Sequence, residues 1–196
     1  LLERVPADLP AMLDYKLMAE NKSLYNTPPR FEIYVVEMVL DWLRGDASKE
    51  TTSPAFRRRL DSYGAHFKLG DLINSSPVYV GPPRSLPDTL ESSPHSSFSA
   101  AFATRANVIY VGGNDGMLHG FDAATGNELL AYVPATLLPN LNTLTDPAYL
   151  HRYYVDGSPV SGDAYATFPG CVPAAAPCWR TVLVSGLGAG GKGYFA

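Results

Sequence analysis

Residues 108–134 constrain the fold more than any other stretch of this chain. They read VIYVGGNDGMLHGFDAATGNELLAYVP, three short apolar runs at 108–111, 117–121 and 128–133 separated by two clusters of turn residues. The first cluster ends in Asn114, Asp115 and Gly116, residue types that tolerate the left-handed backbone of a tight hairpin. The second ends at Gly126 and is typical of a type I turn followed by a left-handed glycine. Because two consecutive tight turns leave no room for a helix, we predict an antiparallel meander.

The chain also repeats itself. Residues 74–78, Asn-Ser-Ser-Pro-Val, return at 156–160 as Asp-Gly-Ser-Pro-Val, and the turn at 111–113 returns at 184–186. Each unit is therefore a strand, an insertion of variable length, a second strand, a glycine-rich turn and a third strand. Such a unit leaves both faces of its sheet uncovered, and radial stacking of neighbouring units covers them. We predict a mainly β fold, part of a β-propeller; a β-sandwich built from hairpins is the competing architecture.

Composition excludes several classes of protein. Of the 196 residues, 46% are apolar and only 17% are charged, which is incompatible with wholesale disorder. The net charge of −4 argues against a nucleic-acid partner, because such proteins normally present a basic face. No apolar run approaches the roughly 18 residues that a membrane-spanning helix requires, so we expect a chain that does not span a membrane.

We divide the chain into an N-terminal segment, 1–68, and an incomplete propeller of about two blades, 69–196. Helical periodicity over 31–44 predicts one amphipathic helix leading into the propeller, with Gly45 placed to end it. Residues 46–67 are polar, and we expect a loop there. The chain starts without Met and stops inside an apparent strand, so we interpret it as a piece of a longer protein, truncated at its C-terminus.

The tripeptide Arg44-Gly45-Asp46 at the end of this helix matches the sequence that integrin receptors bind. In that interpretation the arginine pairs with an acidic groove and the aspartate completes a metal site of the receptor. The alternative is structural: Arg44 favours the negative end of the helix dipole, Gly45 caps the helix and Asp46 begins the next turn.

Cys171 and Cys178 are the two cysteines of the chain, and they bracket a short Pro-rich loop. A disulfide closing this loop would suit an oxidising compartment and is the interpretation we favour. A metal pair is the alternative, although no histidine lies within the usual spacing.

Other candidate chemistry is weak. Residues 186–193, GLGAGGKG, contain part of a phosphate-loop pattern, but Gly193 replaces the required Ser or Thr and a strand follows, so we predict a turn between blade strands. We expect His119 to be packed in the core or between blades and His95 to be a surface residue. We predict no catalytic or cofactor-binding residue, because the four histidines occupy unrelated contexts: His66, His95, His119 and His151.

Two resemblances follow from these motifs. The segment 110–126 resembles the blade repeat of quinoprotein-type propellers, although Leu130 stands where those enzymes usually carry Trp and their adjacent-cysteine disulfide is missing. A closer and ordered set of motifs resembles the C-terminal propeller of PilY-type proteins, tip-associated adhesins and assembly factors of bacterial type IV pili. That set comprises 42–46, 69–80, 113–126, 132–134, 151–153 with 155–159, and 186–193.

The PilY-type resemblance implies a modified, seven-bladed propeller without enzymatic activity. It implies a role in pilus assembly and extension, surface adhesion and twitching motility, with minor pilins at the pilus tip and a host-cell or abiotic surface as partners. The implied location is the cell surface, reached by export through the periplasm.

Family members carry calcium in an Asp-rich loop of the EF-hand type, which restrains pilus retraction. The turn 114–116 is too short to supply six or more oxygens, so we expect any calcium loop to lie past Ala196. The quinoprotein resemblance implies an alternative function, a degenerate periplasmic dehydrogenase with a quinone cofactor of the PQQ type.

Overall fold

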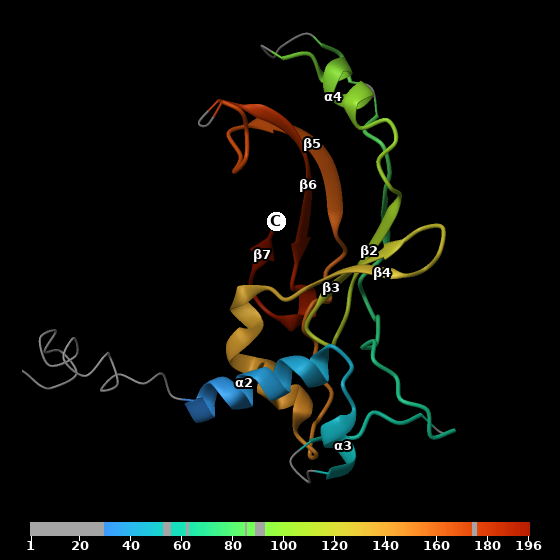
Figure 1. Cartoon of the computed structure of the whole chain (residues 1–196), viewed down its shortest axis with the longest axis vertical. Coiled ribbons are helices and arrows are strands. Elements are labelled where there is room, and N and C mark those ends of the chain that lie inside the picture. Colours follow the sequence, from blue (N-terminus) through green and yellow to red (C-terminus); the bar gives the residue numbers. More distant parts are fainter. Residues whose placement is uncertain (1–29, 53–55, 62, 85, 89–92, 174–175) are drawn as a thin grey trace, which may run out of the picture. The chain divides into compact units, whose positions relative to one another are not determined.

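The structure, a computed structural model, describes residues 30–52, 56–61, 63–84, 86–88, 93–173 and 176–196. The chain forms two compact units, residues 1–46 and 47–196. Within the described residues, no helix has both the length and the apolar character needed to cross a bilayer. Figure 1 shows the strands of the second unit as two curved sheets with short helices at their ends.

The first unit contains one described helix, α2 (Arg30–Leu43), close to the expected 31–44. Trp42 and Leu43 are buried, while Glu37 and Arg44 are exposed. Gly45 has a φ of 101°, and its N–H donates to the carbonyl of Trp42 at 2.9 Å. Asp46 N–H donates to the carbonyl of Asp41, also at 2.9 Å. These two bonds form a Schellman motif, so Gly45 ends the helix as the sequence indicated.

The first sheet of the second unit is the predicted meander with one further strand before it. It has the order β1 (Val78–Val80), β2 (Val108–Gly112), β3 (Leu118–Asp122) and β4 (Glu128–Tyr132). All neighbouring strands are antiparallel, with Tyr110 opposite Gly120 and Gly120 opposite Leu130. Gly120 has no side chain, and this leaves room for the ring of Tyr110. A Cβ at position 120 would lie 2.9 Å from that ring.

The second sheet repeats this plan. It has the order β5 (Val160–Ala166), β6 (Cys178–Gly186) and β7 (Tyr194–Phe195), again antiparallel. β5, β6 and β7 occupy the places of β1, β2 and β3 in the repeat. We call β1–β4 the first blade and β5–β7 the second blade, with the residues that connect their strands.

The two blades meet where their first strands begin. The backbone N–H and side-chain amide of Asn74 donate to the two carboxylate oxygens of Asp156, at 3.1 and 2.7 Å. Ser75 Oγ donates to the carbonyl of Gly157 at 3.1 Å. Each bond joins residues 82 positions apart, so equivalent residues of the two repeats lie side by side. This is the relation expected of adjacent propeller blades, and a sandwich of hairpins does not require it.

Helical segments occupy the connections. They are α3 (Ser48–Thr52), α4 (His95–Ala101), η4 (Ala135–Thr145) and η5 (Gly188–Gly190). η4 completes the core of the first blade: a Cβ on Gly116 would lie 2.8 Å from Leu141, and Leu144 is almost fully buried.

The prediction of a loop over 46–67 is wrong for residues 48–52, which are helical. This segment contains α3, and an isolated bridge pairs Leu60 with His66. Glu50, on α3, is buried. Its carboxylate accepts hydrogen bonds from the Arg59 backbone N–H at 2.9 Å and from the Arg59 Nε–H at 2.8 Å. Burial acts to raise the pKa of Glu50, but these bonds outweigh it and hold the pKa below its usual value. Sequence periodicity could not show that Arg59 is the partner of Glu50.

Candidate functional site

The strongest concentration of interactions lies where the chain enters the second blade. Residues 154–157, which we call the inter-blade segment, run between the glycine-rich turns of the two blades. Tyr154 N–H donates to Asn114 Oδ1 at 3.0 Å, on the side of the first blade. Asp156 N–H and Gly157 N–H donate to the carbonyls of Leu187 and Gly186, at 3.1 and 3.2 Å, on the side of the second. The segment is therefore held by both turns at once.

The predicted turn residues of the first blade have the expected backbone. Gly116 and Gly126 have φ values of 92° and 74°, in the left-handed region that glycine tolerates. In the second turn the Asp122 carboxylate accepts the backbone N–H and the hydroxyl of Thr125, at 2.7 and 2.9 Å. Those bonds lower the pKa of Asp122, because they favour its charged form.

Asn114 and Asp115 do more than form a turn. Both side chains are buried, and Asp115 Oδ2 accepts the N–H of Gly70 at 2.7 Å. The turn thus ties down the segment that precedes β1 as well as the inter-blade segment. Sequence reasoning missed this role, since Gly70 and Asp115 are 45 positions apart and no local pattern links them.

His119 joins this turn to the outer strand of the blade. Its Nε2 lies 3.0 Å from Asp115 Oδ2 and its Nδ1 lies 2.6 Å from Glu128 Oε1. The ring is buried, as expected. Burial lowers the pKa of His119, but the hydrogen bonds and charges of Asp115 and Glu128 outweigh it and raise the pKa above its usual value. A protonated imidazole donates to both carboxylates at once, whereas the neutral ring donates to only one.

The same geometry tests the turn as a calcium site. Asp115 already accepts N–H groups of Gly70 and Met117, and Asn114 Oδ1 accepts Tyr154 N–H. These oxygens are therefore directed at protein donors, so the turn does not fit a cation that needs six or more oxygens. In the part of the chain that the structure describes, no three His, Cys, Asp or Glu side chains group as metal ligands.

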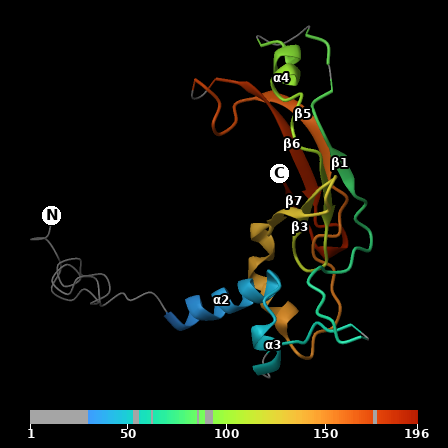
Figure 2. The same ribbon diagram turned by 45° about the vertical axis from the view of Figure 1, so that its right-hand side comes forward.

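His95 corrects the sequence-based expectation of a surface residue. Its side chain is fully buried, and its ring packs edge-on against Trp179 with centroids 4.6 Å apart. Leu86 N–H donates to Nδ1 at 3.3 Å, so the Nε2–H donates to Asp163 Oδ2 at 2.9 Å. The insertion of the first blade, which carries His95 on α4, is thus fixed to the second blade (Figure 2). Its partners in the second blade, Asp163 and Trp179, lie 68 and more positions away, outside the reach of any local signal.

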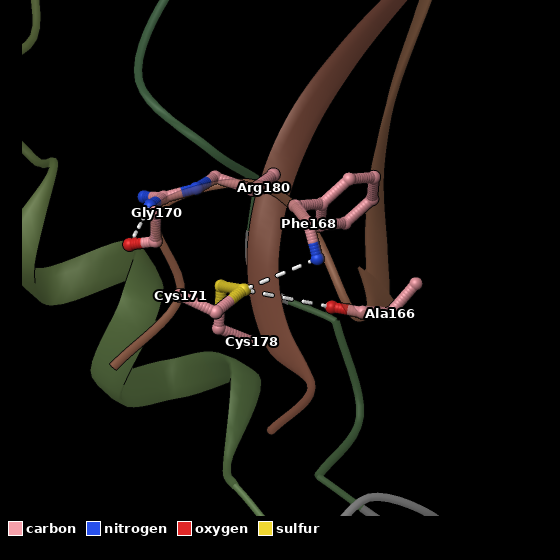
Figure 3. The surroundings of a disulfide bond; sticks show 6 residues. All are labelled: Ala166, Phe168, Gly170, Cys171, Cys178 and Arg180. Atoms are coloured by element: carbon pink, nitrogen blue, oxygen red, sulfur yellow. Dashed lines mark hydrogen bonds between the residues drawn. A yellow bond between two sulfur atoms is a disulfide. The ribbon is translucent and has the colours of Figure 1, made fainter. Parts of the chain in front are cut away.

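Cys171 and Cys178 form a disulfide, the interpretation that the sequence favoured, with Cα atoms 5.7 Å apart (Figure 3). A metal pair is contradicted, because each sulfur is bonded to the other. The loop that the disulfide closes is also held by Arg180, whose Nη2 donates to the carbonyl of Gly170 at 3.0 Å. The insertion of the second blade therefore closes on its own hairpin.

Two predicted motifs remain, the tripeptide 44–46 and the glycine-rich run 186–193. Arg44 and Asp46 are exposed at the end of α2, and Arg44 lies 3.7 Å from Asp41. The integrin interpretation stays a prediction. Residues 186–193 form a turn that contains η5 and leads into β7, a strand and not the helix that a phosphate loop requires.

Comparison with known proteins places these features in a family. The model described as the PilY1 beta-propeller domain matches residues 69–196, more than half of the chain. A Type IV pilus biogenesis factor PilY1 homolog of Xylella fastidiosa is 44% identical over 161 residues, 80% of this chain and 12% of that protein. Type IV pilus biogenesis factor PilY1 of Pseudomonas aeruginosa strain PAK is 46% identical over 162 residues, 79% of this chain and 12% of that protein.

A solved structure is also similar. The crystal structure of the Pseudomonas aeruginosa PilY1 C-terminal domain shares 41% identity, covering 60% of this chain and 21% of that chain with a TM-score of 0.41. The antiparallel sheets and the family match define a β-propeller protein. The chain belongs to the PilY1 β-propeller family, which confirms the resemblance seen in its motifs. It spans about 12% of the length of these curated relatives, and the number of blades stays a prediction.

Proposed function

We propose that the protein to which this chain belongs is a type IV pilus biogenesis factor, and that the chain supplies two adjacent blades of its non-enzymatic propeller. The observation that carries this proposal is the family match, together with the role in pilus biogenesis that the relatives' names state. Those names favour a pilus factor over the quinone-cofactor dehydrogenase that the blade repeat alone left open.

The structure supports a β scaffold whose blades carry different insertions. Strands β5, β6 and β7 repeat the plan of β1, β2 and β3, while the insertions of the two blades differ in length, sequence and attachment. Loops on a rigid frame are where binding functions are usually carried. We propose that minor pilins at the pilus tip contact such insertions and that the assembled protein supports pilus extension, surface adhesion and twitching motility.

The disulfide supports a location outside the reducing cytoplasm, since such bonds persist in the periplasm and at the cell surface. We propose export through the periplasm and residence at the pilus tip, facing a host-cell or abiotic surface. Calcium regulation is proposed for the longer protein only, through a loop outside this sequence.

The test is deletion of the gene in its own bacterium, followed by counting surface pili and measuring twitching zones. We expect loss or strong reduction of both, and restoration by the wild-type gene. Complementation with Asp156→Ala should restore them less well, because it removes both acceptors of Asn74 at the junction. Unchanged piliation and twitching in the deletion strain would contradict the proposal.

Adhesion and calcium need separate readouts. Attachment of piliated cells to epithelial monolayers and to glass, in strains carrying Asp46→Glu, tests whether the tripeptide contributes to host binding alone. Calcium titration of the full-length protein, followed by calorimetry, tests the cation; absence of saturable binding would remove calcium from the proposal without affecting the pilus role.

A further inference from the structure

A cavity of about 420 Å³ lies between the two blades, away from the inter-blade segment. The first blade contributes the end of β1 and the start of its insertion, and the second contributes β5 and β6. Its volume falls within the range of small-molecule sites in proteins. Its lining includes Tyr79, Pro82, Arg84, Arg105, Asp163 and Thr181.

The charges that line this cavity favour an anion. Its lining includes two arginines, Arg84 and Arg105, and one acidic residue, Asp163, in a chain whose net charge is −4. Among the described residues no ion pair involves Arg84. The cavity lining therefore carries more positive than negative charge, although the chain as a whole is acidic.

The Asp163 carboxylate offsets one of the two arginine charges, and its oxygens are held in place by hydrogen bonds. Thr181 Oγ1 donates to Oδ1 at 2.6 Å, and His95 donates to Oδ2 at 2.9 Å. Thr181 in turn accepts from Arg105 Nη1 at 2.7 Å. The polar wall of the cavity is therefore a fixed chain of donors and acceptors.

Arg105 is oriented by this chain and keeps unused donors. Its Nε and Nη2 both donate to the carbonyl of Gly81, the Nε bond measuring 3.1 Å. A guanidinium has five N–H groups in a planar fork, and the bonds to Gly81 and Thr181 use three of them. The remaining two can meet an incoming acceptor, with Arg84 as a second and less constrained cation.

The lining also contains apolar groups. They come from Tyr79, which is 59% exposed although it lies on a strand, and from Pro82, Pro83 and Leu86. Tyrosine and proline rings present surfaces that favour ring-shaped or aliphatic ligand bodies. An inorganic anion would leave these groups uncovered.

We propose that this cavity binds an organic acid, with its carboxylate on Arg105 and Arg84 and its apolar or ring-shaped body against Tyr79 and the prolines. The carboxylate can belong to a free small molecule or to an acidic side chain of a protein segment beside an apolar residue; the chemistry of recognition is the same. This binding activity goes beyond the proposed pilus role and does not depend on it.

The test is an NMR titration of the full chain with 3-phenylpropionate, and with 3-phenylpropanamide as the neutral match. We expect saturable shifts of the Gly81 and Gly162 amides with a Kd on the order of 1 mM for the acid, as a ligand of this size allows. The amide should bind about tenfold more weakly, because it lacks the charge. Equal binding of acid and amide, or no saturable shift, would overturn the proposal.

Variants locate the site. Arg84→Gln should weaken binding of the acid about fivefold and Arg84→Lys should restore part of it, while Arg152→Gln, an exposed arginine outside the cavity, should leave it unchanged. A wild-type spectrum outside the cavity establishes that each variant is folded. Equal effects of Arg84→Gln and Arg152→Gln would reject the assignment.

A second arm distinguishes the two sources of the carboxylate. It uses the blocked dipeptide acetyl-Phe-Glu-amide, whose acid is a side chain. Binding at least as tight as that of 3-phenylpropionate supports a protein segment as the natural ligand. Weaker binding supports a free organic acid.

Discussion

The two blades share a strand plan but hold their glycine-rich turns by different means. In the first blade buried side chains do this: Asn114, Asp115 and His119 bond to neighbouring segments and to β4. In the second blade the backbone itself packs closely, and a Cβ on Gly190 would collide with the carbonyl oxygen of Tyr154. Since Phe121 and Phe195 are equivalent in the repeat, Gly193 stands where the first blade has His119.

The insertions differ in the same way. That of the first blade reaches the second, where His95 bonds to Asp163 and Trp179 Nε1 donates to the carbonyl of Ser93 at 2.9 Å. That of the second blade is closed on its own hairpin by the disulfide between Cys171 and Cys178. The repeated frame therefore comes from backbone pairing, while each blade has its own set of side-chain or covalent links.

We expect the largest effect from a substitution that tests the backbone packing of the glycine-rich turn in the second blade. Gly190→Ala should lower the free energy of unfolding by about 3 kcal/mol, because neither the new Cβ nor the Tyr154 carbonyl can move without disturbing the inter-blade segment. Urea denaturation followed by circular dichroism measures it. Gly162→Ala is the matched control, since no atom lies within 4 Å of a Cβ there. Equal stability of the two variants would show that the turn is not tightly packed.

The next effect concerns the bonds between the blades. Asp156→Ala should cost about 2 kcal/mol of unfolding free energy, because it removes a buried carboxylate and the two hydrogen bonds that it accepts from Asn74. Asp88→Ala, which removes the exposed acceptor of Ser96, should cost less. The comparison is made by thermal and urea denaturation, and a larger loss for Asp88→Ala would contradict the assigned importance of the junction.

The disulfide should matter for the second blade alone. Replacing Cys171 and Cys178 by serine should cost about 2 kcal/mol, as expected for so short a closed loop in the chain-entropy account. Hydrogen exchange should speed up in β5 and β6 and stay unchanged in β2 and β3. Uniform acceleration across both blades would mean that they unfold as one unit.

The smallest effect is the pH dependence of the first turn. Because the pKa of His119 is raised in the folded protein, its contribution is fully present below about pH 6.5, the usual histidine value, and is lost as pH rises through the folded-state pKa. His119→Gln should therefore cost more unfolding free energy at pH 6 than at pH 9. Denaturation at several pH values measures the difference; a cost that grows with pH would show that the neutral ring is the stable form.

The sequence was sufficient for the strands and turns of the first blade because their signals are local. Apolar runs and turn glycines fall within a few residues of one another between 108 and 134, and backbone pairing does the rest. The repeat likewise predicted that residues 74–78 and 156–160 would occupy equivalent places, and they lie side by side.

Tertiary structure alone decided which polar residues are buried and which partners they have. His95 was expected at the surface because no motif in the sequence supplies a partner for it, yet Asp163 and Trp179 enclose it from the next blade. Asp115 was predicted as a turn residue, and only the fold brought Gly70 and His119 within hydrogen-bond distance of its side chain. The reason is physical: periodicity records which way a side chain faces, whereas the free energy of a buried polar group depends on partners that come from any part of the chain.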